Sequence, residues 1–70
     1  MKQVIQVTDT YLLHFTTIPH ENGTKTVRVE SQWTGAKYPD GLQTRWQATL
    51  TNEQWANIAG LLLTREEVDA

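Results

Sequence analysis

The chain has 70 residues, so we expect one domain with a modest core. It contains no cysteine, which excludes disulfides and thiolate metal sites. Its formal net charge is −2 at pH 7, which argues against general nucleic-acid binding, because such proteins present basic surfaces. No apolar run is long enough to cross a membrane, and residues 1–11 lack the apolar segment of a signal peptide. We therefore expect a cytoplasmic protein.

The segment from Gln3 to Ile18 alternates apolar and polar residues, as a β-strand with one buried face does. The apolar positions are Ile5, Val7, Tyr11, Leu13 and Phe15. Asp9 interrupts this set, and the absence of a nearby glycine makes a tight turn less favourable. We favour one long, bent strand; two strands joined by a turn at residues 8–10 are the alternative.

An Asn-Gly pair at 22–23 is a strong signal for a β-hairpin. A two-residue turn there would place Phe15 and Val29 on opposite faces of the sheet. A three-residue loop that ends in a left-handed glycine instead pairs Phe15 with Val29, and Tyr11 with Trp33. All the large apolar groups then share one face, so we predict the three-residue loop.

The second connection, residues 35–41, contains the turn sequence Pro-Asp-Gly, in which Pro fixes φ and Gly accepts a positive φ. An alternating strand follows from Leu42 to Leu50. We predict three cross-strand pairs with the preceding strand: Val29 with Trp46, Trp33 with Leu42, and Glu30 with Arg45. The last pair would be a favourable contact between opposite charges.

A helix is predicted after Thr51. The sequence Thr-Asn-Glu-Gln at 51–54 is a capping box, in which the Thr hydroxyl accepts from a backbone N–H and the Gln side chain reaches back. The apolar positions that follow at helical spacing are Trp55, Ile58, Ala59 and Leu62. We expect this side of the helix to lie on the sheet. Small residues at Ala56 and Gly60 indicate either close packing on the sheet or a helix–helix contact in a dimer.

These elements predict an α+β fold: a three- or four-stranded antiparallel β-meander packed against one C-terminal α-helix, in the order β-β-β-α. Residues 1–64 form a single domain, and residues 65–70 form a flexible acidic tail. We refer to the side of the sheet that carries the predicted core as the apolar face. The predicted core is Ile5, Val7, Leu13, Phe15, Val27, Val29, Trp33, Trp46, Ala48, Leu50, Trp55, Ile58 and Leu62.

The chain shows no arrangement of residues typical of a catalytic or metal site. His14 should point outward from a strand and His20 lies in a turn, so we expect both to be ordinary surface residues. A serine nucleophile would need a partner base, and the lone Ser31 falls on the apolar face. No phosphate-binding glycine motif occurs. We expect no enzymatic activity, no cofactor and no metal.

The opposite side of the sheet, here called the polar face, has no second helix to cover it. It is predicted to carry His14, Thr16, Thr26, Arg28, Glu30, Gln32, Gln43, Arg45, Gln47 and Thr49. Interfaces favour Tyr and Arg, so we predict a protein-binding surface here. The candidate binding residues are Arg28, Glu30, Gln32, Gln43, Arg45, Gln47 and, at the rim, Tyr38.

Two other functions stay open. Arg28 and Arg45 could contact DNA from the sheet, although the negative net charge disfavours this. Alternatively, the chain could be a small structural homodimer that uses the strip at Ala56 and Gly60 or a strand edge. Neither function requires a membrane.

The Glu-Asn-Gly-Thr-Lys hairpin at 21–25 and the Thr-Asn-Glu-Gln helix start at 51–54 resemble features of small phage-encoded inhibitors, including some anti-CRISPR proteins. These segments cover under a fifth of the chain. The resemblance implies a protein that works by binding a host defence or regulatory protein, and it assigns no functional residue.

Overall fold

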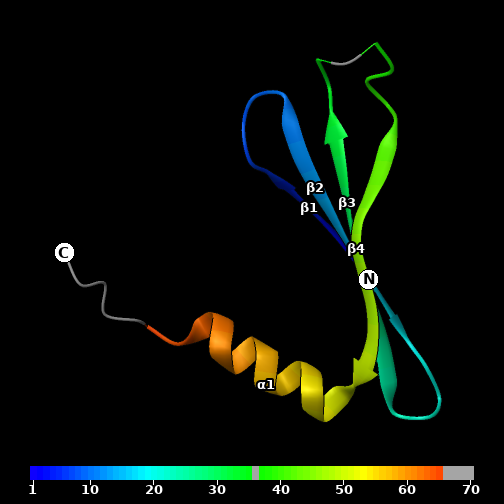
Figure 1. Ribbon diagram of the computed structural model, residues 1–70, viewed down its shortest axis with the longest axis vertical. Helices are drawn as coiled ribbons and strands as arrows, with labels where there is room; N and C mark the ends of the chain where they lie inside the picture. Colours follow the sequence, from blue (N-terminus) through cyan, green and yellow to red (C-terminus); the bar gives the residue numbers. More distant parts are fainter. Residues whose placement is uncertain (36, 66–70) are drawn as a thin grey trace.

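The computed structural model describes residues 1–35 and 37–65 and confirms the α+β fold. Four antiparallel strands follow one another in a meander, and one helix closes the chain (Figure 1). The strands are β1 (Lys2–Gln6), β2 (Tyr11–Pro19), β3 (Thr24–Trp33) and β4 (Leu42–Thr51), and the helix is α1 (Asn52–Leu63). Residues 66–70 of the predicted acidic tail lie outside the described part of the chain.

A turn separates β1 from β2, so the prediction of one long, bent strand is wrong and the four-stranded alternative is right. The backbone N–H groups of Val7 and Thr8 both donate to the carbonyl of Tyr11, at 2.9 and 3.1 Å. The Thr8 hydroxyl also accepts from the backbone N–H of Thr10 at 3.3 Å. Backbone hydrogen bonds and the Thr8 hydroxyl thus stabilise a turn without glycine.

The hairpin between β2 and β3 has the predicted register. Phe15 lies opposite Val29 and Tyr11 opposite Trp33. Gly23 has a φ of 79°, the left-handed conformation expected at the end of a three-residue loop. The side chain of Asn22 accepts from the backbone and the hydroxyl of Thr24, at 3.2 and 2.6 Å, which fixes the turn.

One of the three predicted pairs between β3 and β4 is found. Val29 lies opposite Trp46, as expected. A β-bulge then shifts the register between Val29 and Glu30, so that Glu30 faces Thr44 rather than Arg45. By the same shift Leu42 faces Gln32 and not Trp33, so both of those predicted pairs are wrong. The cause is one extra residue in β4, which alternation alone cannot reveal.

The capping box of α1 is confirmed. The Thr51 hydroxyl accepts from the backbone N–H of Gln54 at 3.1 Å, and the Gln54 side chain accepts from the backbone N–H of Thr51 at 3.0 Å. The backbone N–H of Asn52 donates to the carbonyl of Gly23 at 3.0 Å. The first turn of the helix is therefore tied to the hairpin between β2 and β3.

The helix diverges from the sheet instead of lying along it (Figure 1). Thr51 is both the last residue of β4 and the N-cap of α1, so no loop is present that could fold the helix back. Trp55 and Ile58 are half-buried, whereas Leu61, Leu62 and Leu63 are 64, 77 and 86% exposed. The chain consequently spreads over 43 × 40 × 15 Å.

The prediction of a buried apolar core is wrong for this chain on its own. Among the described residues, no hydrophobic side chain is buried. Trp33 and Trp46, both predicted core residues, are 57 and 48% exposed, and Val7 lies in the turn after β1 at 52%. The apolar residues do gather on one face as expected, but only the first turns of α1 cover that face.

Candidate functional site

The strands β3 and β4 carry hydrogen-bonded side chains on the polar face. Arg28 and Gln47 lie directly opposite each other on β3 and β4. The Arg28 Nε donates to the Gln47 Oε1 at 2.8 Å. The bond links the two long side chains across the strands, an arrangement that favours one geometry for both.

His14 lies on the same face, but it is not the surface residue that we predicted. It is only 9% exposed, and its Nε2 lies 2.7 Å from the Oε1 of Gln32. Glu30 lies directly opposite it on β3. The Gln32 Nε2 in turn donates to the carbonyl of Pro39 at 2.9 Å, which ties the loop after β3 to the sheet. Gln32 therefore links His14 to the loop, and the buried Nδ1 of His14 has no hydrogen-bond partner among the described residues.

Thr26 belongs to a second polar cluster, near the other end of β3, that sequence analysis missed as a buried site. It is 6% exposed, and its hydroxyl lies 2.7 Å from the Thr49 hydroxyl and 2.8 Å from the His20 Nε2. Cross-strand threonine pairs of this kind stabilise antiparallel sheets. The signal available in the sequence was the placement of Thr26 and Thr49 on the same predicted face.

The β4 bulge divides the predicted binding residues between the two faces. Gln43 lies opposite Ser31, which is on the apolar face, and so it leaves the polar face. The Arg45 Nε donates to the Ser31 hydroxyl at 2.7 Å, so this side chain also reaches the apolar face. The placement of Gln43 and Arg45 on the polar face is therefore wrong. A bulge that sets two residues against one explains why Arg45 and Trp46 reach the same side.

The remaining candidates stay together. Arg28, Glu30, Gln32 and Gln47 lie on adjacent strands of the polar face. Tyr38 is 75% exposed in the loop between β3 and β4, the loop that Gln32 holds through the carbonyl of Pro39. The structure thus brings five of the seven predicted residues to the polar face and its rim.

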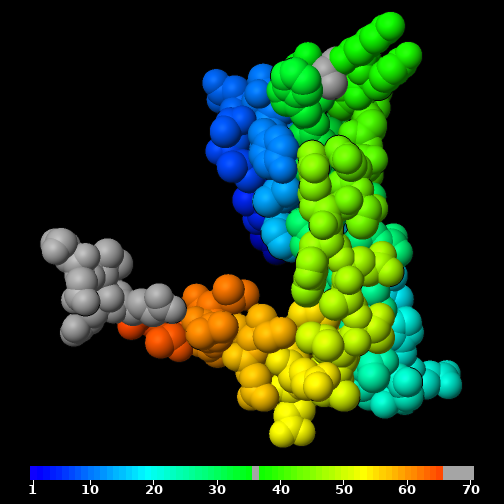
Figure 2. Space-filling model, viewed as in Figure 1, coloured from blue at the N-terminus to red at the C-terminus, as the bar shows by residue number. Residues whose placement is uncertain are grey.

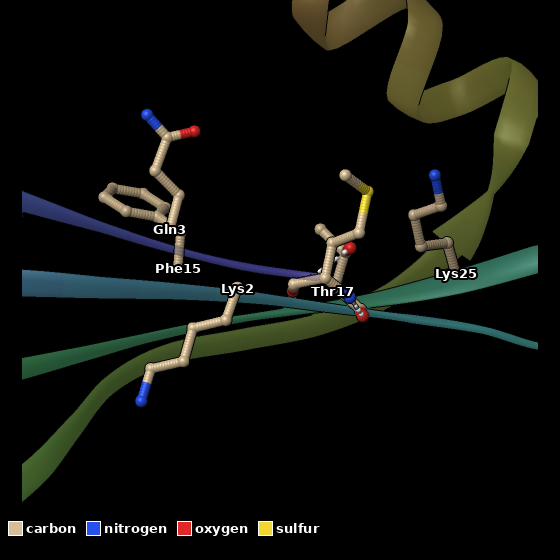
Figure 3. Close-up of a pocket in the computed structure, with 6 residues that line it drawn as sticks. Lys2, Gln3, Phe15, Thr17 and Lys25 are labelled. Carbon is tan, nitrogen blue, oxygen red and sulfur yellow. Dashed lines mark hydrogen bonds between the residues drawn. The ribbon is translucent and has the colours of Figure 1, made fainter.

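A hollow of about 300 Å³ lies beside the N-terminus (Figure 3). Gln3, Phe15 and Lys25 stand on the side of the sheet on which the helix lies, whereas Lys2 points to the opposite side. The terminal ammonium of Met1 donates to the Thr17 carbonyl at 3.0 Å, so it serves to extend the pairing of β1 with β2. The described residues that line the hollow include Met1 with its terminal ammonium, Lys2 and Lys25, and no carboxylate.

A second hollow, an open apolar cleft of about 330 Å³, lies between α1 and the apolar face. Every residue that lines it is apolar: Phe15, Val27, Val29, Trp46, Trp55, Ile58, Ala59 and Leu62. The helix therefore turns its predicted apolar side toward the sheet. Figure 2 shows that side chains leave open the angle between the outer turns of α1 and the far part of the sheet.

Comparisons with protein-family models, with curated proteins and with solved structures give no match to this chain. The resemblance to phage inhibitors thus stays a prediction. Within residues 1–35 and 37–65, no group of three or more His, Asp or Glu residues is placed to hold a metal ion. In the same part of the chain, no helix is long and apolar enough to span a membrane.

Proposed function

We propose that this chain is a non-enzymatic protein-binding module that recognises its partner through the polar face. The observation that supports this proposal is the hydrogen-bonded order of side chains there: Arg28 with Gln47, and His14 with Gln32. Side chains already held in one rotamer lose less conformational entropy on binding, which favours affinity and specificity. An inhibitor of a host defence or regulatory protein, of the phage type, is the form of this function that the resemblance implies.

The chemistry of the face suits a protein partner of mixed polarity. Arg28 offers guanidinium donors that stay free after the bond to Gln47, Glu30 offers acceptors, and Tyr38 adds an exposed aromatic ring at the rim. Arg and Tyr are enriched among the residues that dominate interface energies. Charges of both signs on one small area select a complementary partner and repel others.

DNA binding by the sheet is the weaker alternative. It relied on Arg28 and Arg45 acting together, and these two side chains now lie on opposite faces. Glu30 also lies within the polar face, where it would repel phosphates. The net charge of −2 adds to that repulsion.

A capture experiment tests the proposal. Tagged protein is incubated with host lysate, with and without nuclease, and bound material is identified by mass spectrometry. We expect a stoichiometric protein partner that survives nuclease treatment. Arg28→Ala should abolish capture, whereas Arg45→Ala, the same change on the opposite face, should retain it.

Two results would count against the protein-binding proposal. Partners that disappear with nuclease, together with recovered DNA, would favour the nucleic-acid alternative. Equal loss of capture with Arg28→Ala and Arg45→Ala, in proteins that remain folded, would show that the polar face is not the recognition surface.

A further inference from the structure

The single chain is more extended than a compact monomeric domain of the same size. Its accessible surface is 5878 Å², against about 4,450 Å² expected for a compact monomer of 8.0 kDa. Its radius of gyration is 15.0 Å, against about 11 Å for a compact domain of 70 residues. The excess surface of about 1,400 Å² exceeds the ~800 Å² that each partner buries in a standard protein interface.

Several of the exposed large hydrophobic side chains lie on the apolar face. The cleft between α1 and the sheet is lined only by apolar residues, and Trp46 at its wall is 48% exposed. Further along the same face, Trp33 is 57% and Ile5 41% exposed. Large exposed apolar surfaces often mark association sites, so this face is a candidate for one.

The helix supplies the matching half of such an interface. Leu61, Leu62 and Leu63 end α1 and are 64, 77 and 86% exposed, although Leu62 also lines the cleft toward its own sheet. Each chain therefore has a projecting apolar helix end and an uncovered apolar sheet face (Figure 1). A twofold axis pairs two such surfaces reciprocally, and that self-complementarity defines an isologous dimer.

We propose that a second copy of this chain covers the apolar face, with the last turns of each α1 packed on the sheet of the other copy. A second copy is the occupant because the chain buries no hydrophobic side chain among its described residues. A chain that buries so little apolar surface cannot offset the conformational entropy that it loses on folding. The partner must therefore be bound whenever the chain is folded. Obligate homodimers meet that need, and their interfaces resemble a domain core divided in two.

This interface differs from the one predicted from the small-residue strip. A Cβ added at Gly60 would meet no atom within 4 Å, so the chain leaves that position open. The proposed contact uses the side of α1 that carries Trp55, Ile58 and Leu62. It leaves both polar faces outward, so the dimer would present two copies of the surface proposed for partner binding. The dimer proposal does not depend on that function.

Sedimentation equilibrium over a wide range of concentration gives the first measurement. We expect a mass twice 8.0 kDa. Leu62→Glu should raise the dimer dissociation constant by about a hundredfold, because a carboxylate would replace an apolar contact. Leu42→Glu is the matched control, since Leu42 is 44% exposed and pairs with Gln32 on the polar face. A folded species of 8.0 kDa at all concentrations would overturn the proposal.

A second measurement locates the interface in the intact chain and does not depend on the folding of Leu62→Glu. A spin label is attached at Leu62→Cys, in a chain that has no other cysteine, and the labelled chain is mixed with isotope-labelled wild type. Paramagnetic broadening of the indole N–H signals of Trp33 and Trp46 supports the dimer. No broadening between chains, or broadening confined to the Gln47 amide on the polar face, contradicts it.

Discussion

Trp46 and Trp55 meet edge to face, with ring centroids 5.9 Å apart and ring planes at 83°. The Trp55 Nε1 also donates to the backbone carbonyl of Lys25 at 2.7 Å. One side chain of α1 therefore contacts both β4 and β3. Because the later turns of the helix leave the sheet, this contact, with the tie from Asn52 to Gly23, fixes the direction of α1.

The ring contact should appear as an energetic coupling between the two tryptophans. We expect a double-mutant cycle of Trp46→Ala and Trp55→Ala to give a coupling of about 0.5–1.5 kcal/mol in the free energy of unfolding, the usual value for such aromatic pairs. Urea unfolding followed by circular dichroism measures it, with all variants at one protein concentration, since self-association would make the apparent stability depend on concentration. As a control, the effects of Tyr38→Ala and Trp55→Ala on the free energy of unfolding should simply add. If the effects of Trp46→Ala and Trp55→Ala also added, the ring contact would be contradicted.

The capping box gives a second prediction. Thr51→Ala removes the acceptor for the backbone N–H of Gln54, so the free energy of unfolding should fall by about 1 kcal/mol. Thr51→Ser keeps the hydroxyl and should stay within a few tenths of a kcal/mol of wild type. Thermal unfolding of the three proteins compares them. A loss in Thr51→Ser as large as in Thr51→Ala would mean that the hydroxyl bond is not the stabilising contact.

The turn glycine gives a third prediction. Gly23 has a φ of 79°, which costs an L-residue roughly 1–2 kcal/mol. Space is not the constraint, because a Cβ at this position would meet nothing within 4 Å. Gly23→Ala should therefore lower the free energy of unfolding by about 1 kcal/mol, and Gly23→Asn by less, since Asn tolerates this conformation. Chemical denaturation measures both variants. If Gly23→Ala and Gly23→Asn lowered the free energy of unfolding equally, backbone strain would not be the cause.

Local chemistry explains why much of the fold was predictable. The Asn-Gly hairpin, the capping box and the alternation around Phe15 and Val29 depend on neighbouring residues, and each appears as expected. The turn at Thr8 was less visible because backbone hydrogen bonds and one bond to the Thr8 hydroxyl close it without a glycine. Local patterns thus predicted the elements and the pairing of β2 with β3.

The candidate site was less predictable for a different reason. Face assignment along β4 requires knowing where the alternation slips, and nothing near Arg45 marks the bulge. The path of α1 after the cap depends on the absence of a loop at Thr51, and the exposure of the apolar face follows from that path. These properties depend on the three-dimensional arrangement of the elements. The alternation of apolar and polar residues therefore could not predict which face carries Gln43 and Arg45, or that the predicted core is exposed.

The bulge itself gives the last prediction, which concerns two single-residue deletions in β4. Deleting Arg45 removes the extra residue and joins Thr44 directly to Trp46, so that both strands keep their present partners in a regular ladder. We expect this variant to fold and to lose about 1–2 kcal/mol, largely the hydrogen bond from Arg45 to Ser31. Its thermal unfolding should remain cooperative.

Deleting Gln47 instead should be severely destabilising. A one-residue slip in a regular part of the strand moves every side chain on one side of the cut to the other face. Either Trp46 would leave the apolar face, or Ala48 and Leu50 would, and the junction with α1 would shift with them. We expect no cooperative unfolding transition for this variant. Since each variant lacks one residue from the same strand, similar stability of the two deletions would contradict the bulge, and with it the placement of Arg28 and Arg45 on opposite faces.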